Sequence, residues 1–114
     1  MSGRRSQDKG KRAERGFATL GRSCGFDEAR RAAQLQAHGG FGADVIGFPG
    51  LHVEVKNQEN LNIWAALRQA DEGRQPGELA VVAFTRNRHP FYIATLAEPF
   101  LQIYKGAYAP SDHS

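Results

Sequence analysis

Apolar residues recur at helical intervals in the first quarter of the chain. Four of them follow one another at steps of four, three and four residues, which places them on one face of a helix over about residues 8–23. These residues are Ala13, Phe17, Leu20 and Cys24. Glu14 lies beside this apolar strip, and we therefore expect its carboxylate at the edge of the buried surface.

Strand-like runs follow in the middle of the chain. Residues 43–48 and 51–56 flank a Pro-Gly pair, which is typical of two strands joined by a turn. Residues 79–85 (LAVVAFT) are almost continuously apolar, as in a central strand that is covered on both faces. Residues 91–96 predict a further strand.

Two more helices and one ambiguous segment complete the pattern. Residues 60–73 carry apolar side chains at helical spacing, and residues 99–104 predict a short closing helix. Residues 26–38 favour a helix by composition, but a short strand at residues 29–33 also fits. This order of elements predicts a small α/β domain.

The composition is that of one folded domain. The chain has 114 residues, of which 40% are apolar and 24% charged, which fits a single core and excludes a largely disordered protein. No apolar run approaches the roughly 18 to 20 residues that cross a bilayer, and no secretory signal is recognisable. Cys24 is the single cysteine, which fits a reducing compartment. We expect one domain over residues 1–114 that works in the cytoplasm without membrane contact, with a loose tail at residues 107–114.

Positive charge is concentrated at the N-terminal end of the chain. The formal net charge is +3, but residues 1–31 hold nine arginines and lysines against four acidic residues. Such a surplus is typical of proteins that bind polyanions through salt-sensitive phosphate contacts. Taken alone, this charge is explained equally well by a solvated surface without a binding role, so a second feature has to distinguish the two explanations.

Two acidic residues and a lysine provide the candidate chemistry. Asp44 precedes Glu54 by ten residues, and Lys56 shares the strand face of Glu54. A carboxylate from the neighbouring strand would complete an oxygen-rich corner suited to Mg²⁺. Two carboxylates about 4 Å apart repel by about 4 kcal/mol at an effective dielectric constant of about 20, so such a pair tends to hold a proton or a divalent cation. Lys56 is suited to orient or deprotonate a water molecule or to stabilise charge on a phosphate.

The connection between the two strands decides whether this acidic pair forms. A two-residue Pro-Gly loop would turn Asp44 away from Glu54, and a type II turn fits a hairpin poorly. We therefore expect a connection of odd length or a bulge in which Gly47 or Gly50 takes up the extra residue. Alternatively, Asp44 lies at the open end of the hairpin, where the two strands separate.

These motifs resemble a known group of nucleases. The D-x9-E-x-K pattern is similar to that of the PD-(D/E)XK superfamily of restriction-endonuclease-like nucleases, although Ala43 stands where many members have proline. The wider layout over residues 4–105 resembles the archaeal-type Holliday-junction resolvases, including versions carried by phages. The matching features are the helix KGKRAERGFATLGRSCGF with its Glu14, an arginine-bearing segment before a Gly-rich loop, GADVIGF and HVEVK.

The resemblance implies a fold, a cofactor and a set of site residues. The fold would be a restriction-endonuclease-like core, with a central mixed β-sheet flanked by helices and a basic N-terminal arm at residues 1–7. Asp44 and Glu54 would bind Mg²⁺, for which Mn²⁺ can substitute, with the carbonyl of Val55 as a third ligand. Lys56 would activate or position the hydrolytic water.

The resemblance also extends the site to two helices and to basic residues. Glu14 would join the metal ligands from the first helix, and Gln69 would touch the site from the helix after the motif. The residues implied to bind DNA are Arg4, Arg5, Lys9, Lys11, Arg12, Arg30 and Arg31.

The implied activity is resolution of four-way DNA junctions by a Mg²⁺-dependent endonuclease that makes two symmetric nicks and leaves 5′ phosphates. Two nicks need two sites, which a homodimer supplies, and part of the apolar surplus in residues 91–104 is assigned to its interface. Such an enzyme would work in the cytoplasm of a bacterial or archaeal cell, or of a host if a phage encodes it. A related phage nuclease for flaps, single strands or duplex, and a non-catalytic nucleic-acid-binding module, remain alternatives.

Three conspicuous residues receive no catalytic role in this interpretation. Trp64 is expected in the core, with base stacking as the minority alternative. Cys24 is expected to be buried, without the basic partner of a nucleophilic thiol. His52 shares the strand face of Glu54, but the histidines show no metal-ligand spacing.

Overall fold

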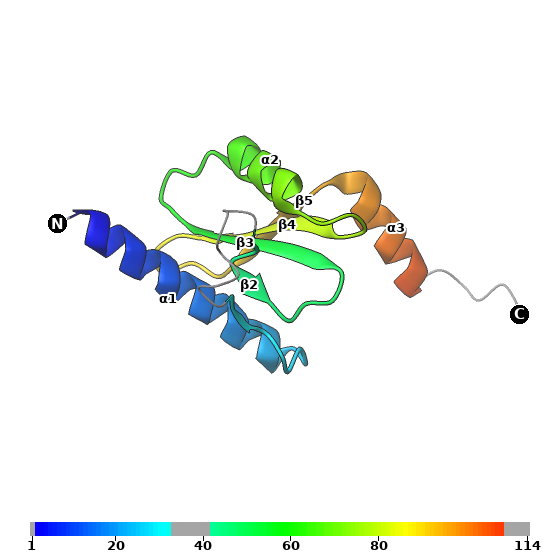
Figure 1. Cartoon of the computed structure of the whole chain (residues 1–114), viewed down its shortest axis with the longest axis horizontal. Coiled ribbons are helices and arrows are strands. Elements are labelled where there is room, and N and C mark those ends of the chain that lie inside the picture. The colour runs from blue at the N-terminus through cyan, green and yellow to red at the C-terminus, as the bar shows by residue number, and fades with distance from the viewer. Residues whose placement is uncertain (1, 33–41, 109–114) are drawn as a thin grey trace, which may run out of the picture.

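The computed structural model describes residues 2–32 and 42–108, and within them three helices and five strands (Figure 1). The helices are α1 (Ser2–Ser23), α2 (Ile63–Gly73) and α3 (Ala97–Tyr108). The strands are β1 (Arg30–Arg31), β2 (Val45–Ile46), β3 (Leu51–Asn57), β4 (Leu79–Thr85) and β5 (Tyr92–Thr95). No helix in these described ranges combines the length and the apolar character needed to cross a membrane.

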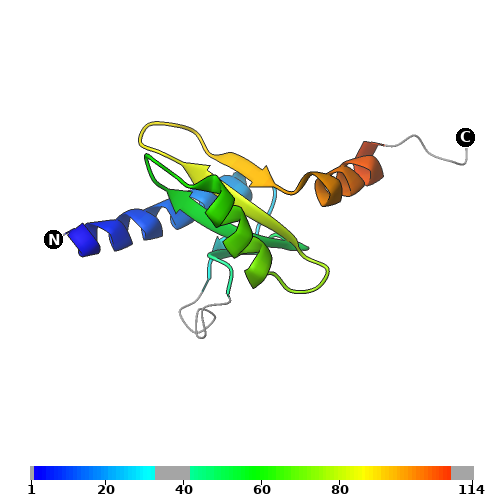
Figure 2. The ribbon, with the colours of Figure 1, turned by 90° about the horizontal axis from the view of Figure 1, so that it is seen from above.

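The five strands form one mixed sheet in the order β1-β2-β3-β4-β5. Strands β3 and β4 run parallel, whereas all other neighbours run antiparallel. A parallel pair needs a crossover connection, and α2 provides it. Helix α1 lies on one face of the sheet and α2 on the other (Figures 1 and 2). The expected α/β architecture, a mixed sheet flanked by helices, is confirmed.

Alternation along β3 divides its side chains between two hydrophobic clusters. Val53 and Val55 face α1, where they pack with Phe17. The intervening side chains, among them Glu54, therefore lie on the face that α2 covers. On that face the small residues Ala66 and Ala70 of α2 pack against β4. The sheet thus places the candidate chemistry under α2 and separates it from the α1 core.

Helix α3 projects away from the sheet (Figures 1 and 2), and none of its residues is buried. Its aromatic side chains stack on one another at helical intervals, with ring centroids 6.2 Å apart for Phe100 and Tyr104 and 4.9 Å apart for Tyr104 and Tyr108. The exposed apolar side chains in and next to α3 are Leu96, Phe100, Leu101, Ile103, Tyr104 and Tyr108. This helix therefore carries an apolar surface that the other described residues do not cover.

The element bounds differ from the expected ones where the sequence carries no apolar pattern. Helix α1 begins at Ser2, so residues 2–7, expected as an arm, continue the helix. The segment at 29–33 provides a strand rather than a helix at Arg30–Arg31, and residues 33–38 lie outside the described residues. Residues 107 and 108 of the expected tail belong to α3, and the rest of that tail is likewise outside the described residues.

Three side chains expected in the core are exposed, and the first is Leu20 of α1, which is 41% exposed. Cys24 lies beyond the end of α1 and is exposed, because the turn after the helix carries it away from the sheet. Trp64 is 80% exposed on the outer face of α2. The apolar spacing of α2 is satisfied by Ile63 and Leu67, which pack on the buried cluster, and this leaves Trp64 on the opposite side of the helix.

The exposure of Trp64 predicts a simple fluorescence result. Trp64 is the single tryptophan of the chain, so its emission maximum should match that of tryptophan free in water. The substitution Trp64→Ala should change the free energy of unfolding by less than about 0.5 kcal/mol, as surface substitutions usually do. A blue-shifted emission at low protein concentration would show that the side chain is covered.

Candidate active site

The connection between β2 and β3 brings Asp44 to the face of Glu54. Val45 pairs with Val53, which leaves an odd number of residues in the connection and sets Asp44 opposite Glu54. The backbone N–H of Asp44 donates to the carbonyl of Val53 (2.9 Å). The carboxylate of Asp44 accepts a hydrogen bond from the N–H of Val55 (2.9 Å), so at this point a side chain joins the two strands. The expected connection of odd length is therefore present.

Two glycines shape the turn of this hairpin. Gly47 has φ +97° and Gly50 has φ +80°, values that side chains with a Cβ rarely adopt. Between them Phe48 accepts a hydrogen bond from the N–H of Leu51 (3.0 Å), which closes the turn. Gly47 also lies directly against the backbone of Glu28, so the hairpin is fixed to the segment before β1.

The two carboxylates of the site lie close enough to perturb each other. The pKa of Asp44 is raised from 3.8 to about 6, mainly by burial and in addition by the charge of Glu54 and a hydrogen bond with it. The N–H of Val55 and the ammonium group of Lys56 act in the opposite direction. Asp44 therefore holds a proton in mildly acidic solution, and a cation placed between the carboxylates would displace it.

This raised pKa predicts a pH-dependent difference in stability between the wild type and Asp44→Asn. A raised native pKa stabilises the fold below pH 4, and that contribution is lost as the pH rises through about 6. Asparagine does not ionise, so the variant has no such pH dependence. In EDTA, the free energy of unfolding of Asp44→Asn minus that of the wild type should therefore be about 2 kcal/mol larger at pH 7 than at pH 4. Urea unfolding at the two pH values measures this, and a pH-independent difference would contradict it.

Glu54 is buried beside a histidine. Its side chain is 7% exposed, and its Oε2 lies 2.7 Å from Nε2 of His52, which is itself 3% exposed. The other ring nitrogen of His52 lies 4.0 Å from a carboxylate oxygen of Glu78. His52 and Glu78 are thus parts of the site that the sequence analysis did not assign. The signal was present in the motif HVEVK, where the histidine and the glutamate are two residues apart on one strand face.

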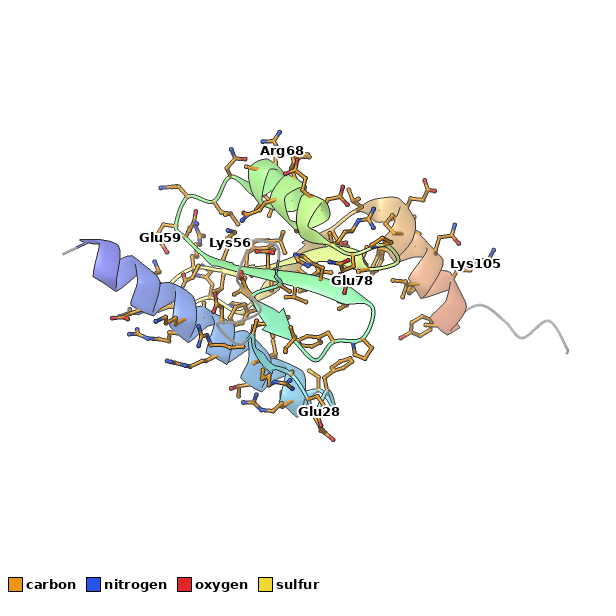
Figure 3. All side chains as sticks on the ribbon, viewed as in Figure 1. Glu28, Lys56, Glu59, Arg68, Glu78 and Lys105 are labelled. Carbon is orange, nitrogen blue, oxygen red and sulfur yellow. The ribbon has the colours of Figure 1, made fainter. Side chains whose placement is uncertain are left out.

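Lys56 and Gln69 are brought together at the carboxyl end of β3. The ammonium Nζ of Lys56 donates a hydrogen bond to Oε1 of Gln69 on α2 (3.1 Å). Asn62 caps α2 by accepting from the N–H of Ala65 (3.1 Å), which fixes where the helix begins and hence where Gln69 lies. Figure 3 shows Lys56 toward one end of β3 and Glu78 toward the other, so the site extends along the strand.

Glu14 is engaged elsewhere. Its Oε1 accepts a hydrogen bond from Nε of Arg31 (2.9 Å), and Arg31 pairs with Val45, whose side chain belongs to the α1 core. Glu14 therefore lies on the α1 face of the sheet, and the expectation that it joins the acidic pair is not met. Within residues 2–32 and 42–108, no group of three or more His, Cys, Asp and Glu side chains is arranged to hold a metal ion.

The residues implied to bind DNA lie on α1 and on β1. Lys11 and Arg12 are exposed on α1, and Lys9 is partly exposed there. Arg30 is exposed and lies 3.8 Å from the carboxylate of Glu28. Arg31 is held by Glu14, as described above. For Arg4 and Arg5 the structure describes the helical backbone of α1 only.

Comparison with known proteins adds no assignment to this geometry. The chain matches no protein-family model, no curated protein and no solved structure. The function therefore has to be argued from the residues of the site itself.

Proposed function

We propose that the chain is a Mg²⁺-dependent endonuclease with a restriction-endonuclease-like core, and that its substrate is the four-way DNA junction. The proposal depends on one observation: Asp44 and Glu54 converge under α2, on the strand face that also bears Lys56. Two carboxylates that repel each other beside an ammonium group suit the hydrolysis of a phosphodiester. The choice of a junction as substrate comes from the resemblance of the motifs to the resolvases.

The acidic pair fits a divalent ion that is bound through oxygen. Burial and the repulsion by Glu54 raise the pKa of Asp44 to about 6 because both disfavour its charged form. A bound cation would offset both effects. Mg²⁺ commonly takes one or two protein carboxylates together with waters and substrate phosphates, so a third acidic side chain is not required. The carbonyl oxygen of Val55 is a further candidate ligand, and Mn²⁺ shares the preference for oxygen. The ion would supply charge relief on the scissile phosphate and a more acidic attacking water.

The residues around the pair have distinct tasks in this mechanism. Lys56 would position the attacking water or stabilise the charge that develops on the phosphate. Gln69 accepts a hydrogen bond from Lys56 and thereby orients its ammonium group. The N–H of Val55 holds one oxygen of Asp44, so this carboxylate is oriented by the backbone. Ordered side chains of this kind lower the cost of reaching the reactive geometry.

Exposed basic residues of α1 are the proposed contact with the DNA backbone. Lys11, Arg12 and Arg15 are exposed, and the N-terminal half of α1 extends beyond the sheet (Figure 2). A helix that projects in this way can follow a phosphate chain, and each neutralised phosphate would make binding weaker at higher salt. The remaining candidates on α1 are Arg4, Arg5 and Lys9.

Cleavage of labelled DNA in the presence of Mg²⁺ tests the proposed function. Purified protein should introduce paired, symmetric nicks with 5′ phosphates into a four-way junction, and EDTA should abolish the cleavage. Equally fast cleavage of flaps, single strands or linear duplex would agree with a nuclease but would contradict the four-way junction as its specific substrate.

A non-catalytic nucleic-acid-binding module is the second candidate function. The ion pair between Glu14 and Arg31 favours it, because this pair leaves two carboxylates rather than three on the proposed metal side. Junction binding without cleavage in Mg²⁺ and in Mn²⁺ would select this candidate.

We further propose that a second copy of the chain covers α3. An isolated helix of 12 residues is marginal in water, yet no segment within residues 2–32 and 42–108 buries the apolar side chains of α3. Strand β5, which leads into α3, is an edge strand of the sheet, and its outer backbone edge pairs with none of the other described strands. An identical partner would cover both features and supply the second site that paired nicks require.

Substitution of Leu101, which is 56% exposed, tests this dimer. A charge buried in an apolar interface is costly, so Leu101→Glu should weaken dimerisation at least about 100-fold and give a monomer in light scattering. The matched variant Gln102→Glu adds the same charge at a neighbouring exposed, polar position and should remain dimeric. A wild-type protein that is monomeric at high concentration would contradict the proposal.

A further inference from the structure

We propose that His52 is a positioning residue that orients the carboxylate of Glu54 for the metal ion. This inference rests on the proposed function, because it concerns the same site. It adds a residue that neither the motif nor the resemblance assigns, and it predicts an effect on ion affinity that can be measured without DNA.

The ring of His52 lies between two carboxylates and is at hydrogen-bond distance from one of them. Nε2 lies 2.7 Å from Oε2 of Glu54, a hydrogen-bond distance, and Nδ1 lies 4.0 Å from Oε1 of Glu78. Only 3% of His52 is exposed. A buried polar ring is costly unless its nitrogens have partners, and here each nitrogen faces a carboxylate.

Glu78 is itself fixed by the backbone. Its Oε1 accepts a hydrogen bond from the N–H of Gln75 (2.8 Å), and its own N–H donates to the carbonyl of Gln75 (3.0 Å). The turn between α2 and β4 therefore places a carboxylate beside Nδ1 of the ring. Two carboxylates thus flank the ring, that of Glu54 at 2.7 Å from Nε2 and that of Glu78 at 4.0 Å from Nδ1.

The contact with His52 leaves Glu54 one oxygen for other partners. Oε2 is engaged by the ring, so the remaining oxygen is the one suited to a metal ion shared with Asp44. A carboxylate that is free to rotate would have to be ordered each time an ion binds. Hydrogen-bond partners behind metal ligands provide this order in advance, and their loss typically lowers metal affinity about 10- to 100-fold.

Two substitutions separate positioning from a merely structural role. In His52→Gln the side-chain amide nitrogen occupies the place of Nε2 and can still donate to Glu54. In His52→Asn the amide is one methylene shorter, so it reaches only the place of Nδ1 and the contact with Glu54 is lost. Both replacements are neutral and polar, so they should affect folding similarly.

Isothermal titration with Mn²⁺ in the absence of DNA is the decisive measurement. His52→Asn should raise the dissociation constant of Mn²⁺ about 10- to 100-fold, whereas His52→Gln should stay within about threefold of the wild type. The exposed His89 provides a control, and His89→Asn should bind as the wild type does. In cleavage assays His52→Asn should need more Mg²⁺ for half-maximal rate but approach the wild-type rate at saturation.

The possible outcomes distinguish this inference from the proposed function. A wild type that binds no Mn²⁺ overturns both. A wild type that binds Mn²⁺, with His52→Asn binding equally well, overturns the positioning role alone. If His52→Asn does not fold, ¹⁵N-NMR of the wild-type ring decides, because Mg²⁺ should shift the Nε2 resonance of His52 with the same half-saturation as binding, and an unmoved resonance overturns the proposal.

Discussion

Replacement of Glu54 by glutamine is expected to abolish junction cleavage while the protein still folds and binds DNA. The substitution keeps the size of the side chain but removes a charge that would hold the metal ion beside Asp44. A metal ion contributes several kcal/mol of transition-state stabilisation, so the cleavage rate should fall at least about 1,000-fold. Junction binding in Ca²⁺, measured by fluorescence anisotropy, should be at least as tight as that of the wild type, because a negative charge near the phosphate is gone.

A second acidic residue provides the matched control for this result. Glu72 is exposed on α2, and Glu72→Gln makes the same chemical change away from the site. Its cleavage rate should equal that of the wild type. If Glu54→Gln cleaves at more than a tenth of the wild-type rate, the proposed catalytic role of Asp44 and Glu54 is contradicted.

Replacement of Gly47 by alanine is expected to be the most destabilising change at any glycine of the hairpin. Its φ of +97° is strained for a residue with a Cβ, and the added methyl group would overlap the backbone of Glu28 and Ala29. Strain and overlap together should lower the free energy of unfolding by about 3 kcal/mol or more, seen as a fall of about 10 °C in the melting temperature. Thermal unfolding followed by circular dichroism measures this change.

Gly50 separates the two causes. It also has a positive φ (+80°), but a Cβ added there meets no atom within 4 Å. The variant Gly50→Ala should therefore show the backbone strain alone, about 1 kcal/mol. Equal losses in the two variants would mean that the close approach of Gly47 to the segment before β1 contributes nothing to stability.

The sequence predicts the elements with the strongest apolar pattern well. The continuous run at residues 79–85 has the observed bounds of β4, and the strand at 51–56 is β3 with one residue added. The start of α1 was not predicted, because the residues before position 8 carry no apolar period. A strand as short as β1 has no period at all, so the ambiguity of its segment was inherent.

The candidate site could be predicted only in part. The approach of Asp44 to Glu54 required a connection of odd length or a bulge, and the register of Val45 with Val53 provides the odd-length connection. The position of Glu14 depends on the ion pair with Arg31, and a contact between side chains 17 residues apart leaves no signal in spacing. Trp64 was misplaced for a similar reason, since apolar character alone does not say which face of α2 is buried.

The hydrogen bond between Asp44 and Val55 makes the sheet part of the chemistry. At this point β3 is joined to its neighbour by a side chain and not by a peptide group. A ligand that binds the other oxygen of the Asp44 carboxylate therefore acts on a side chain that also holds two strands together. Ligand binding at Asp44 and the pairing of β2 with β3 are therefore thermodynamically coupled, so binding should also change the stability of this part of the sheet.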